Sequence, residues 1–401
     1  MKHIARFFTL YWIIYFPTCI AYNDLPGFSN IDEMMTIILF LFTLLMCRKR
    51  YINRKPSKEF IVCLGIIAFY FVYSLIWGVN VLGGILLDLM QEVRPYTIIF
   101  CTWILNPQFS KKQKKWMLAT MVLTLASWII YHPESFENRN AEFPVLGQLA
   151  ICTGMAWYLL TKQTKRNRNI ALLLVLTGML APKFKFMGEV VCFIAFIYFL
   201  KKRLNFRSPK TILYCTVIAT IVLTVTWTRF DAYYVSGLNN EYLARPMTYK
   251  TSLKILCDYL PFGPGFGTFA CNGAWKFYSP LYYKYNLNDI WGLDEGGGFI
   301  CDSYYPTLAQ FGIVGVFFFL WFWKRRFKEI NVIQDMRYYR VAMITVCCLA
   351  IEQTADSSWL SGKGMGYCML LALCLNANRN MMIERQRQMA AAANEQVETP
   401  E

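Results

Sequence analysis

Long runs of apolar residues alternate with short polar segments along the chain. A helix that crosses the hydrocarbon core of a membrane needs about 20 predominantly apolar residues, and four of the runs approach this length without a charge. The other runs are shorter or carry charged residues, and two pairs of short runs indicate helices joined by tight turns. The predicted membrane segments are residues 7–23, 34–47, 60–78, 82–105, 116–131, 143–161, 169–182, 185–200, 211–228, 303–323, 341–352 and 364–377. The pattern predicts an all-α, polytopic bundle of about 12 transmembrane helices.

The composition supports this interpretation. Hydrophobic residues make up 56% of the 401 residues and charged residues only 16%, whereas soluble domains carry about 25% charged residues. The chain therefore lacks the charge to cover a soluble surface. A soluble enzyme, a secreted disulfide-stabilised domain and a disordered protein all fit poorly.

The 41 Lys and Arg residues give a net charge of +16, and most of them lie in every second connection between apolar segments. Cytoplasmic connections are enriched in Lys and Arg. The alternation therefore predicts a multi-pass protein of the bacterial inner membrane with both termini in the cytoplasm. These basic groups orient the helices beside anionic lipids and do not indicate a nucleic-acid partner. The eleven basic residues that break the alternation are Arg94, Arg139, Lys183, Lys185, Arg229, Arg245, Lys250, Lys254, Lys276, Lys284 and Lys363.

One long segment without an apolar run falls on the periplasmic side and is rich in Tyr, Gly and Asp. A connection of this length in a compact protein is usually functional. The chain accordingly divides into transmembrane residues 1–228, a periplasmic loop 229–301, transmembrane residues 302–378 and a polar tail 379–401. Because disulfides form in an oxidising compartment, Cys271 and Cys301 of this loop are candidates for a pair.

Two groups of charges at membrane depth need compensating partners, because a charge there costs about 2.5–3.5 kcal/mol on insertion scales. Lys185 lies near an outer turn, and Glu189 four residues later can pair with it. The alternative is a cationic site for a phosphate at the outer boundary. Arg94 has Asp88 and Glu92 in its own segment, which favours a structural ion-pair cluster.

The region that begins at Arg245 is the most informative part of the loop. Pro246 suits the first turn of a helix, the following residues form a short amphipathic pattern, and Pro261 ends it. A D-x-x-P-F-G-x-G-x-G-x-F motif starts at Asp258. Its alternate glycines leave a backbone that side chains do not crowd. These glycines are Gly263, Gly265 and Gly267.

This arrangement resembles the O-antigen ligase/polymerase superfamily of bacterial envelope glycosyltransferases. Residues 302–315 read Asp-Ser-Tyr-Tyr-Pro-Thr-Leu-Ala-Gln-Phe-Gly-Ile-Val-Gly. They are similar to the family's polar start followed by an apolar helix with an L-x-E/Q-x-G-x-x-G pattern, which Gln310, Gly312 and Gly315 match in part. Residues 139–144 resemble the family's Arg-containing entry into a middle helix. The topology and the long outer loop also resemble the family.

The resemblance implies an enzyme that joins polyprenyl-diphosphate-linked oligosaccharide units into O-antigen, capsule or exopolysaccharide by inverting transfer. The lipid diphosphate departs with negative charge, which cationic groups at the membrane boundary stabilise, and a carboxylate can serve as general base. The expected catalytic residues are Arg245, Arg139, Lys185 and Asp302, with Asp294 and Glu295 as alternative bases. The expected substrate-binding residues are Lys183, Gly263, Gly265, Gly267, Glu295 and Tyr249.

Two departures from the family pattern bear on the reaction. The family usually has Ser-Arg where this chain has Lys-Phe-Lys-Phe at 183–186, and Lys keeps the charge but loses the bidentate fork. The ligases have a His where this chain has Cys301 or Asp302. This favours a polymerase over a ligase that transfers glycan to lipid A core. A flippase or transporter of the same lipid-linked sugar is a third interpretation, but the internal repeat typical of transporters is not evident.

The loop aromatics have two interpretations, because they can stack on sugar rings or anchor the loop at the membrane interface. They are Tyr233, Tyr234, Trp275, Tyr278, Tyr282, Tyr283, Tyr285 and Trp291. The sequence has neither a His cluster nor a D-x-D motif, so we expect no metal and no cofactor. The expected partners are the lipid-linked oligosaccharide, membrane lipids and a chain-length regulator.

Overall fold

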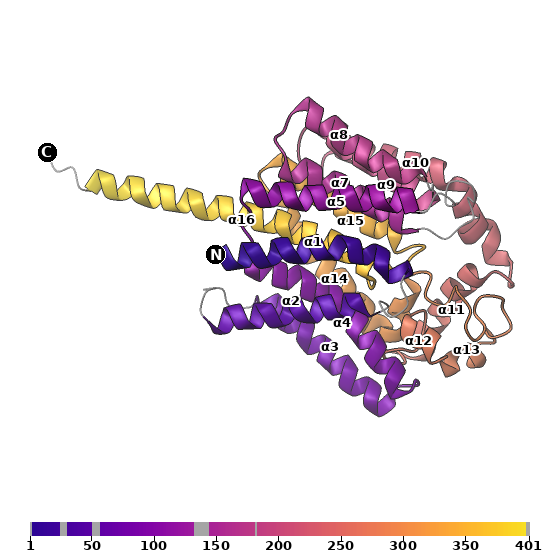
Figure 1. Ribbon diagram of the computed structural model, residues 1–401. Coiled ribbons are helices and arrows are strands. Elements are labelled where there is room, and N and C mark those ends of the chain that lie inside the picture. The colour runs from indigo at the N-terminus through magenta and orange to yellow at the C-terminus, as the bar shows by residue number, and fades with distance from the viewer. Residues whose placement is uncertain (1, 25–29, 50–56, 132–143, 181–182, 398–401) are drawn as a thin grey trace.

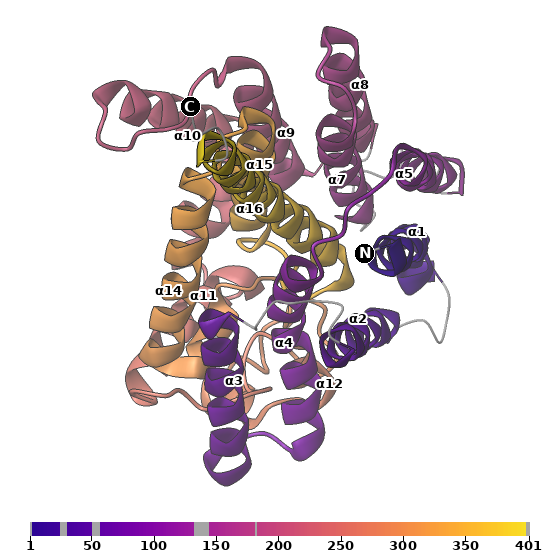
Figure 2. The same cartoon turned by 90° about the vertical axis from the view of Figure 1, so that its left-hand side faces the viewer.

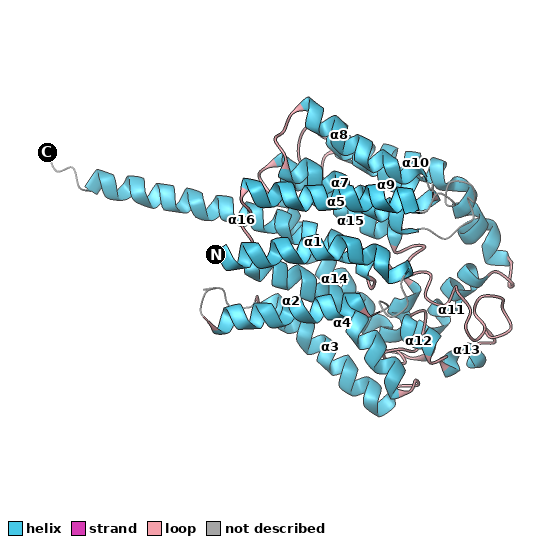
Figure 3. Cartoon of the chain, viewed as in Figure 1, coloured by secondary structure: helices cyan, strands magenta, loops and turns pink. Residues whose placement is uncertain are grey.

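The computed structural model describes residues 2–24, 30–49, 57–131, 144–180 and 183–397, and these ranges contain helices and turns but no β-strand (Figures 1 and 3). The predicted all-α fold is confirmed. The helices are α1 (Lys2–Asp24), α2 (Ile31–Arg48), α3 (Lys58–Trp77), α4 (Leu82–Leu105), α5 (Lys111–Tyr131), α7 (Pro144–Leu160), α8 (Lys165–Leu176), α9 (Phe184–Ile194), α10 (Pro209–Phe230), α11 (Ala244–Asp258), α12 (Asn272–Lys276), α13 (Pro280–Lys284), α14 (Gly312–Asn331), α15 (Met336–Glu352) and α16 (Gly362–Val397).

Local sequence explains where several helices begin. The Ser57 side chain accepts a hydrogen bond from the Phe60 N–H (3.1 Å) at the start of α3. Asp335 accepts one from the Arg337 N–H (2.8 Å) at the start of α15. These caps satisfy N–H groups that have no partner within the helix. Helix α10 begins at Pro209, which has no N–H to leave unpaired.

Each predicted apolar segment coincides with a helix where the structure describes it. Within the described ranges, three helical stretches are both long enough and apolar enough to cross a membrane, namely Lys58–Trp77, Pro209–Val235 and Pro306–Asn331. The other stretches are shorter or more charged. Length and composition therefore support three spans, and the twelve-span bundle goes beyond what the helices show.

Much of the apolar surface is exposed. Helix α10 has no buried residue although it is predominantly apolar, and Leu213 is 65% exposed on it. Large exposed apolar surfaces mark contact with a membrane or with another protein. This observation is compatible with a membrane protein.

The central helices α4 and α16 pack against each other, and α16 also packs against α15 (Figure 2). Most residues of α4 are buried, including its charged side chains. Beyond this core α16 continues as a long helix that projects from the bundle (Figure 1). The predicted polar tail is thus a continuation of the last helix as far as Val397.

The segment predicted as a periplasmic loop folds into a compact cap. It contains α11, α12 and α13 and lies at the end of the bundle opposite the projecting part of α16 (Figure 1). We call this end the outer end. The cap has its own small core, which includes Phe269, Leu281, Tyr282 and Leu293. The helix predicted after Arg245 is α11.

Candidate functional site

Four segments that are remote in sequence meet at the outer end of the bundle. They are the start of α9, helix α11, the turn that precedes Pro306, and the turn after α15. Backbone carbonyls of the last turn contact the turn before Pro306 and α11, and Lys185 at the start of α9 contacts the Asp356 side chain of that last turn. The Gln353 carbonyl accepts a hydrogen bond from the Tyr304 N–H (3.1 Å), and the Thr354 carbonyl accepts one from the Tyr249 hydroxyl (2.9 Å) and one from the Tyr234 hydroxyl (2.6 Å).

Arg245 and Asp302 form an ion pair at this meeting point. The Arg245 side chain is 12% exposed and that of Asp302 25%, so both charges are largely shielded from water. The guanidinium also lies over the ring of Tyr233, 4.3 Å from its centroid, a favourable cation–π geometry. Burial raises the pKa of Asp302 above the usual range of an aspartate, although the guanidinium opposes this shift.

Lys185 has partners other than the one expected from sequence. Its ammonium group contacts Glu352 Oε2 at 2.7 Å and Asp356 Oδ2 at 2.6 Å. The predicted pairing with Glu189 is wrong, because Glu189 is fully buried in the bundle and accepts a hydrogen bond from the Tyr367 hydroxyl (3.3 Å). Lys185 lies in the first turn of α9 and faces the turn after α15.

The glycine motif forms a tight loop against α3, α4 and the segment before α14. The Gly265 N–H donates a hydrogen bond to the Gln310 carbonyl (2.9 Å), and the Gly267 N–H donates one to Asp88 Oδ2 (2.8 Å). The Gly263 carbonyl accepts from the Tyr73 hydroxyl (3.0 Å). All three glycines have positive φ angles. In this structure the motif attaches the cap to the bundle, and its predicted role in binding substrate stays a prediction.

The expected cluster of Arg94 with Asp88 and Glu92 is not formed. Arg94 instead pairs with Asp32 and Glu33 of α2, at 2.5 Å each. Residues two or six positions apart on a helix point to different faces, so the carboxylates of its own helix cannot reach it. Asp88 contacts the glycine loop, and the Tyr304 hydroxyl donates to Glu92 (3.2 Å).

The remaining predicted residues lie in different places. Asp294 and Glu295 are exposed in the cap, and Asp294 accepts a hydrogen bond from the Gly292 N–H (2.7 Å). Lys183 immediately precedes α9. Arg139 lies outside the described residues. The structure thus gathers Arg245, Asp302, Lys185 and Tyr249 around one turn.

Sequence reasoning missed the acidic side of this site. Glu352, Asp356 and Lys363 occupy the turn after α15 or flank it, and Lys363 contacts Asp356 Oδ2 at 3.6 Å. The available signal was the placement of two carboxylates at the end of one apolar run and just beyond it, at the same predicted membrane face as Lys185. Charges at such a boundary usually have partners.

The candidate disulfide between Cys271 and Cys301 is absent, since all 14 cysteines are free thiols. Cys271 is buried, and its Sγ accepts a hydrogen bond from the Ala274 N–H (3.4 Å) at the start of α12. This position fixes the thiol within the cap core. Among the described residues, no group of three or more His, Cys, Asp or Glu side chains gathers as a metal site would require.

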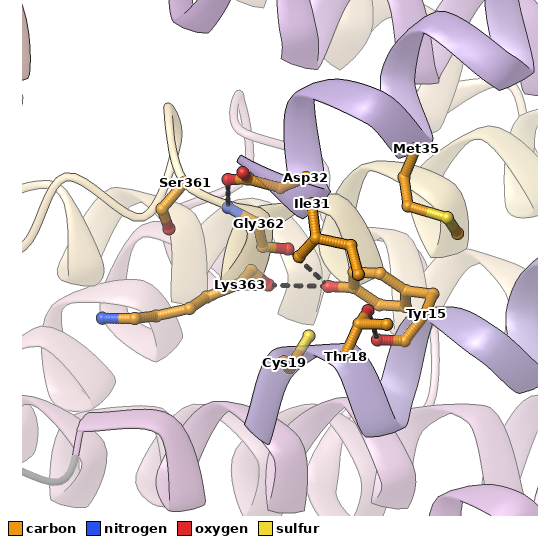
Figure 4. Close-up of a pocket in the computed structure, with 9 residues that line it drawn as sticks. All are labelled: Tyr15, Thr18, Cys19, Ile31, Asp32, Met35, Ser361, Gly362 and Lys363. Carbon is orange, nitrogen blue, oxygen red and sulfur yellow. Dashed lines mark hydrogen bonds between the residues drawn. The ribbon is translucent and has the colours of Figure 1, made fainter. Parts of the chain in front are cut away.

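A small cavity lies beside the site, between α1, α2 and the start of α16 (Figure 4). The Tyr15 hydroxyl donates to the Gly362 carbonyl (2.6 Å), and Asp32 accepts from the Gly362 N–H (2.9 Å). The Lys363 side chain extends away from Tyr15 (Figure 4). The first turn of α16 is therefore fixed on one side, while Lys363 faces the candidate site on the other.

The sequence was also compared with known proteins. No family model matches the chain, and none of the curated proteins matches it in sequence.

Proposed function

We propose that the protein polymerises polyprenyl-diphosphate-linked oligosaccharide units at the periplasmic face of a bacterial inner membrane. The products are polysaccharides of the O-antigen, capsule or exopolysaccharide class. The proposal includes the twelve-span topology with both termini in the cytoplasm, and a chain-length regulator as partner. It would place the cap formed by residues 229–301 outside the cytoplasm.

One observation carries the proposal. Arg245, Lys185 and Asp302 were singled out from separate stretches of sequence, and they lie around one turn at the outer end of the bundle. Residues that serve only as independent membrane anchors have no reason to converge. Convergence of two cations and a carboxylate is what transfer from a diphosphate carrier requires.

The chemistry follows from these groups. An acceptor hydroxyl oxygen attacks the anomeric carbon of the donor sugar while the bond from that carbon to the phosphate oxygen breaks. The lipid diphosphate leaves with the bonding electrons, and Arg245 and Lys185 stabilise its added charge. Asp302 takes the hydroxyl proton. A single displacement of this kind inverts the anomeric configuration.

Arg245→Ala tests the proposal in cells that depend on this protein for polymer. Loss of long chains is expected, with single lipid-linked units accumulating. Arg325→Ala is a matched control, because Arg325 is half-exposed on α14 and pairs only loosely with Glu59 (3.6 Å). Normal chain lengths in a stably expressed Arg245→Ala variant would exclude the proposed role. Polymer that forms on the carrier but is not attached to lipid A core would instead indicate a ligase.

A further inference from the structure

Asp356 lies between two ammonium groups at the outer end of the bundle. Its Oδ2 atom is 2.6 Å from Lys185 Nζ and 3.6 Å from Lys363 Nζ. The side chain of Asp356 is 12% exposed, that of Lys185 13% and that of Lys363 18%. One oxygen that accepts a hydrogen bond from one largely buried ammonium group and lies within ion-pair distance of a second has surroundings similar to those of a phosphate oxygen in an anion site.

We infer that Lys185 and Lys363 form an oxyanion-binding site and that Asp356 is an internal counter-ion which the phosphate groups of a diphosphate displace. The choice of a diphosphate as ligand rests on the proposed function. The site itself, in which Asp356 covers the two ammonium groups, rests on the geometry of the three side chains. We call this covering of the cations masking. Asp356 therefore keeps the site closed until a more highly charged anion arrives.

The two carboxylates that contact Lys185 differ in how firmly they are held. Glu352 is the last residue of α15 and is 1% exposed, so the helix fixes its backbone. Asp356 lies in the turn between α15 and α16, outside both helices. Displacing Asp356 leaves Lys185 paired with Glu352, and the incoming phosphate replaces Asp356 as the partner of Lys363, so neither ammonium group becomes uncompensated.

Lys363 is held less tightly than Lys185, since its contact with Asp356 is 3.6 Å and that of Lys185 is 2.6 Å. The Lys363 side chain lines two small cavities that share Tyr15 and Cys19, and Asp356 is its ion-pair partner within the described part of the chain. An ammonium group on a flexible stem is a mobile point charge that adapts to a phosphate. The site can therefore open by movement of Asp356 and Lys363 while Lys185 stays in place.

Masking also provides selectivity. A monoanionic phospholipid headgroup carries the same charge as the Asp356 carboxylate and gains little by replacing it. A diphosphate carries more negative charge and gains more from the two cations. The mask thus favours a diphosphate over the phospholipids that surround the protein.

Inorganic pyrophosphate is the probe, titrated by calorimetry into purified full-length protein. Asp356→Asn removes the counter-ion and is expected to bind pyrophosphate about tenfold more tightly, equivalent to roughly 1.4 kcal/mol. Adding Lys363→Gln to this variant is expected to abolish the gain. Glu241→Gln is the charge-matched control, because Glu241 is 74% exposed and pairs with Lys250 in the cap. Equal or weaker binding by a folded Asp356→Asn variant would overturn the inference.

Two further measurements complete the test. If Asp356→Asn does not fold, Lys363→Gln alone is expected to weaken pyrophosphate binding, and unchanged affinity would contradict the site. Titration in nanodiscs of phosphatidylcholine or phosphatidylglycerol identifies the ligand source. Equal affinities support a diphosphate site, whereas loss of binding in phosphatidylglycerol would assign the site to phospholipid and overturn the inferred selectivity. These results do not depend on the polymer assay of Arg245→Ala, so either proposal can fail alone.

Discussion

Arg245 and Asp302 form an ion pair across 57 positions of the chain. The pair joins α11, in the cap, to the turn that leads into α14. The Tyr233 ring lies against the guanidinium, so the cation is held by a carboxylate on one side and an aromatic face on another. A change at Arg245 therefore affects the orientation of the charge as well as its presence.

Arg245→Lys separates these two effects. Lysine retains the positive charge but loses the planar fork and the stacking on Tyr233. We expect transfer to fall by about tenfold, compared with about a hundredfold or more for Arg245→Ala. Polymer formation by purified protein from lipid-linked units measures both variants. Equal rates for wild type and Arg245→Lys would show that geometry at this position is unimportant.

Asp302→Asn tests the general base through its pH dependence. A base must be ionised, so activity is expected to fall as the pH drops through the pKa of Asp302. Burial raises this pKa, which places the fall at a higher pH than for an exposed aspartate. The Asp302→Asn variant should lose most of its activity, and the activity that remains should no longer fall as the pH drops through this range. Asp294→Asn is the comparison, and transfer of the loss to Asp294→Asn would reassign the base to the exposed part of the cap.

Asp356→Asn is expected to lower stability in a pH-dependent way. Burial favours the protonated acid, but the ammonium groups of Lys185 and Lys363 outweigh it and lower the pKa of Asp356 below the ordinary value of 3.8. A group with a depressed folded-state pKa stabilises the protein above the unfolded pKa, and this contribution disappears as the pH falls through the folded one.

At neutral pH the free energy of unfolding of the wild type should therefore exceed that of Asp356→Asn by about 2 kcal/mol. This difference in free energy of unfolding should become smaller as the pH falls through and below 3.8. Thermal melting in detergent measures the difference at each pH. Glu241→Gln removes an exposed ion pair and should change little. A difference that becomes larger with acidification would contradict the sign of the effect.

The helices could be predicted from sequence because hydropathy is a local property. Apolar runs marked the helices of the bundle, and α11 has Pro246 in its first turn and ends before Pro261. The number of membrane spans could not be read in the same way. A run such as residues 82–105 is apolar on average yet buries Asp88, Glu92 and Arg94 against neighbouring helices, so hydropathy does not distinguish a lipid-facing helix from a core helix.

The partners of charged residues could not be predicted, because they come from other elements. Arg94 pairs with α2 and Lys185 with the turn after α15. Sequence proximity suggested partners on the same helix in both cases. The cations of the candidate site were identified because they violated the charge alternation, but Glu352 and Asp356 violated no rule. Only the fold places them beside Lys185.

Arg94→Met is expected to destabilise the bundle strongly. The side chain is 1% exposed and pairs with Asp32 and Glu33, so its removal leaves buried carboxylates without a cation. Breaking a buried ion pair in this way costs about 3–5 kcal/mol. Adding Asp32→Asn should recover part of the loss by removing one uncompensated charge. Thermal melting of the single and double variants measures the recovery, and a less stable double variant would contradict it.

Gly267→Ala tests whether the glycine motif attaches the cap to the bundle. A Cβ at Gly267 would lie 2.5 Å from the Gly84 carbonyl oxygen of α4, and the residue has φ +73°. The strain of a positive φ and the steric clash add, so the loss of stability should exceed about 2 kcal/mol. Gly296→Ala measures the strain of a positive φ without the clash, because Gly296 has φ +83° but no atom within 4 Å of an added Cβ. Thermal melting should rank wild type above Gly296→Ala, and Gly296→Ala well above Gly267→Ala. Equal losses in the two variants would show that contact with α4 contributes nothing, and that backbone conformation alone requires these glycines.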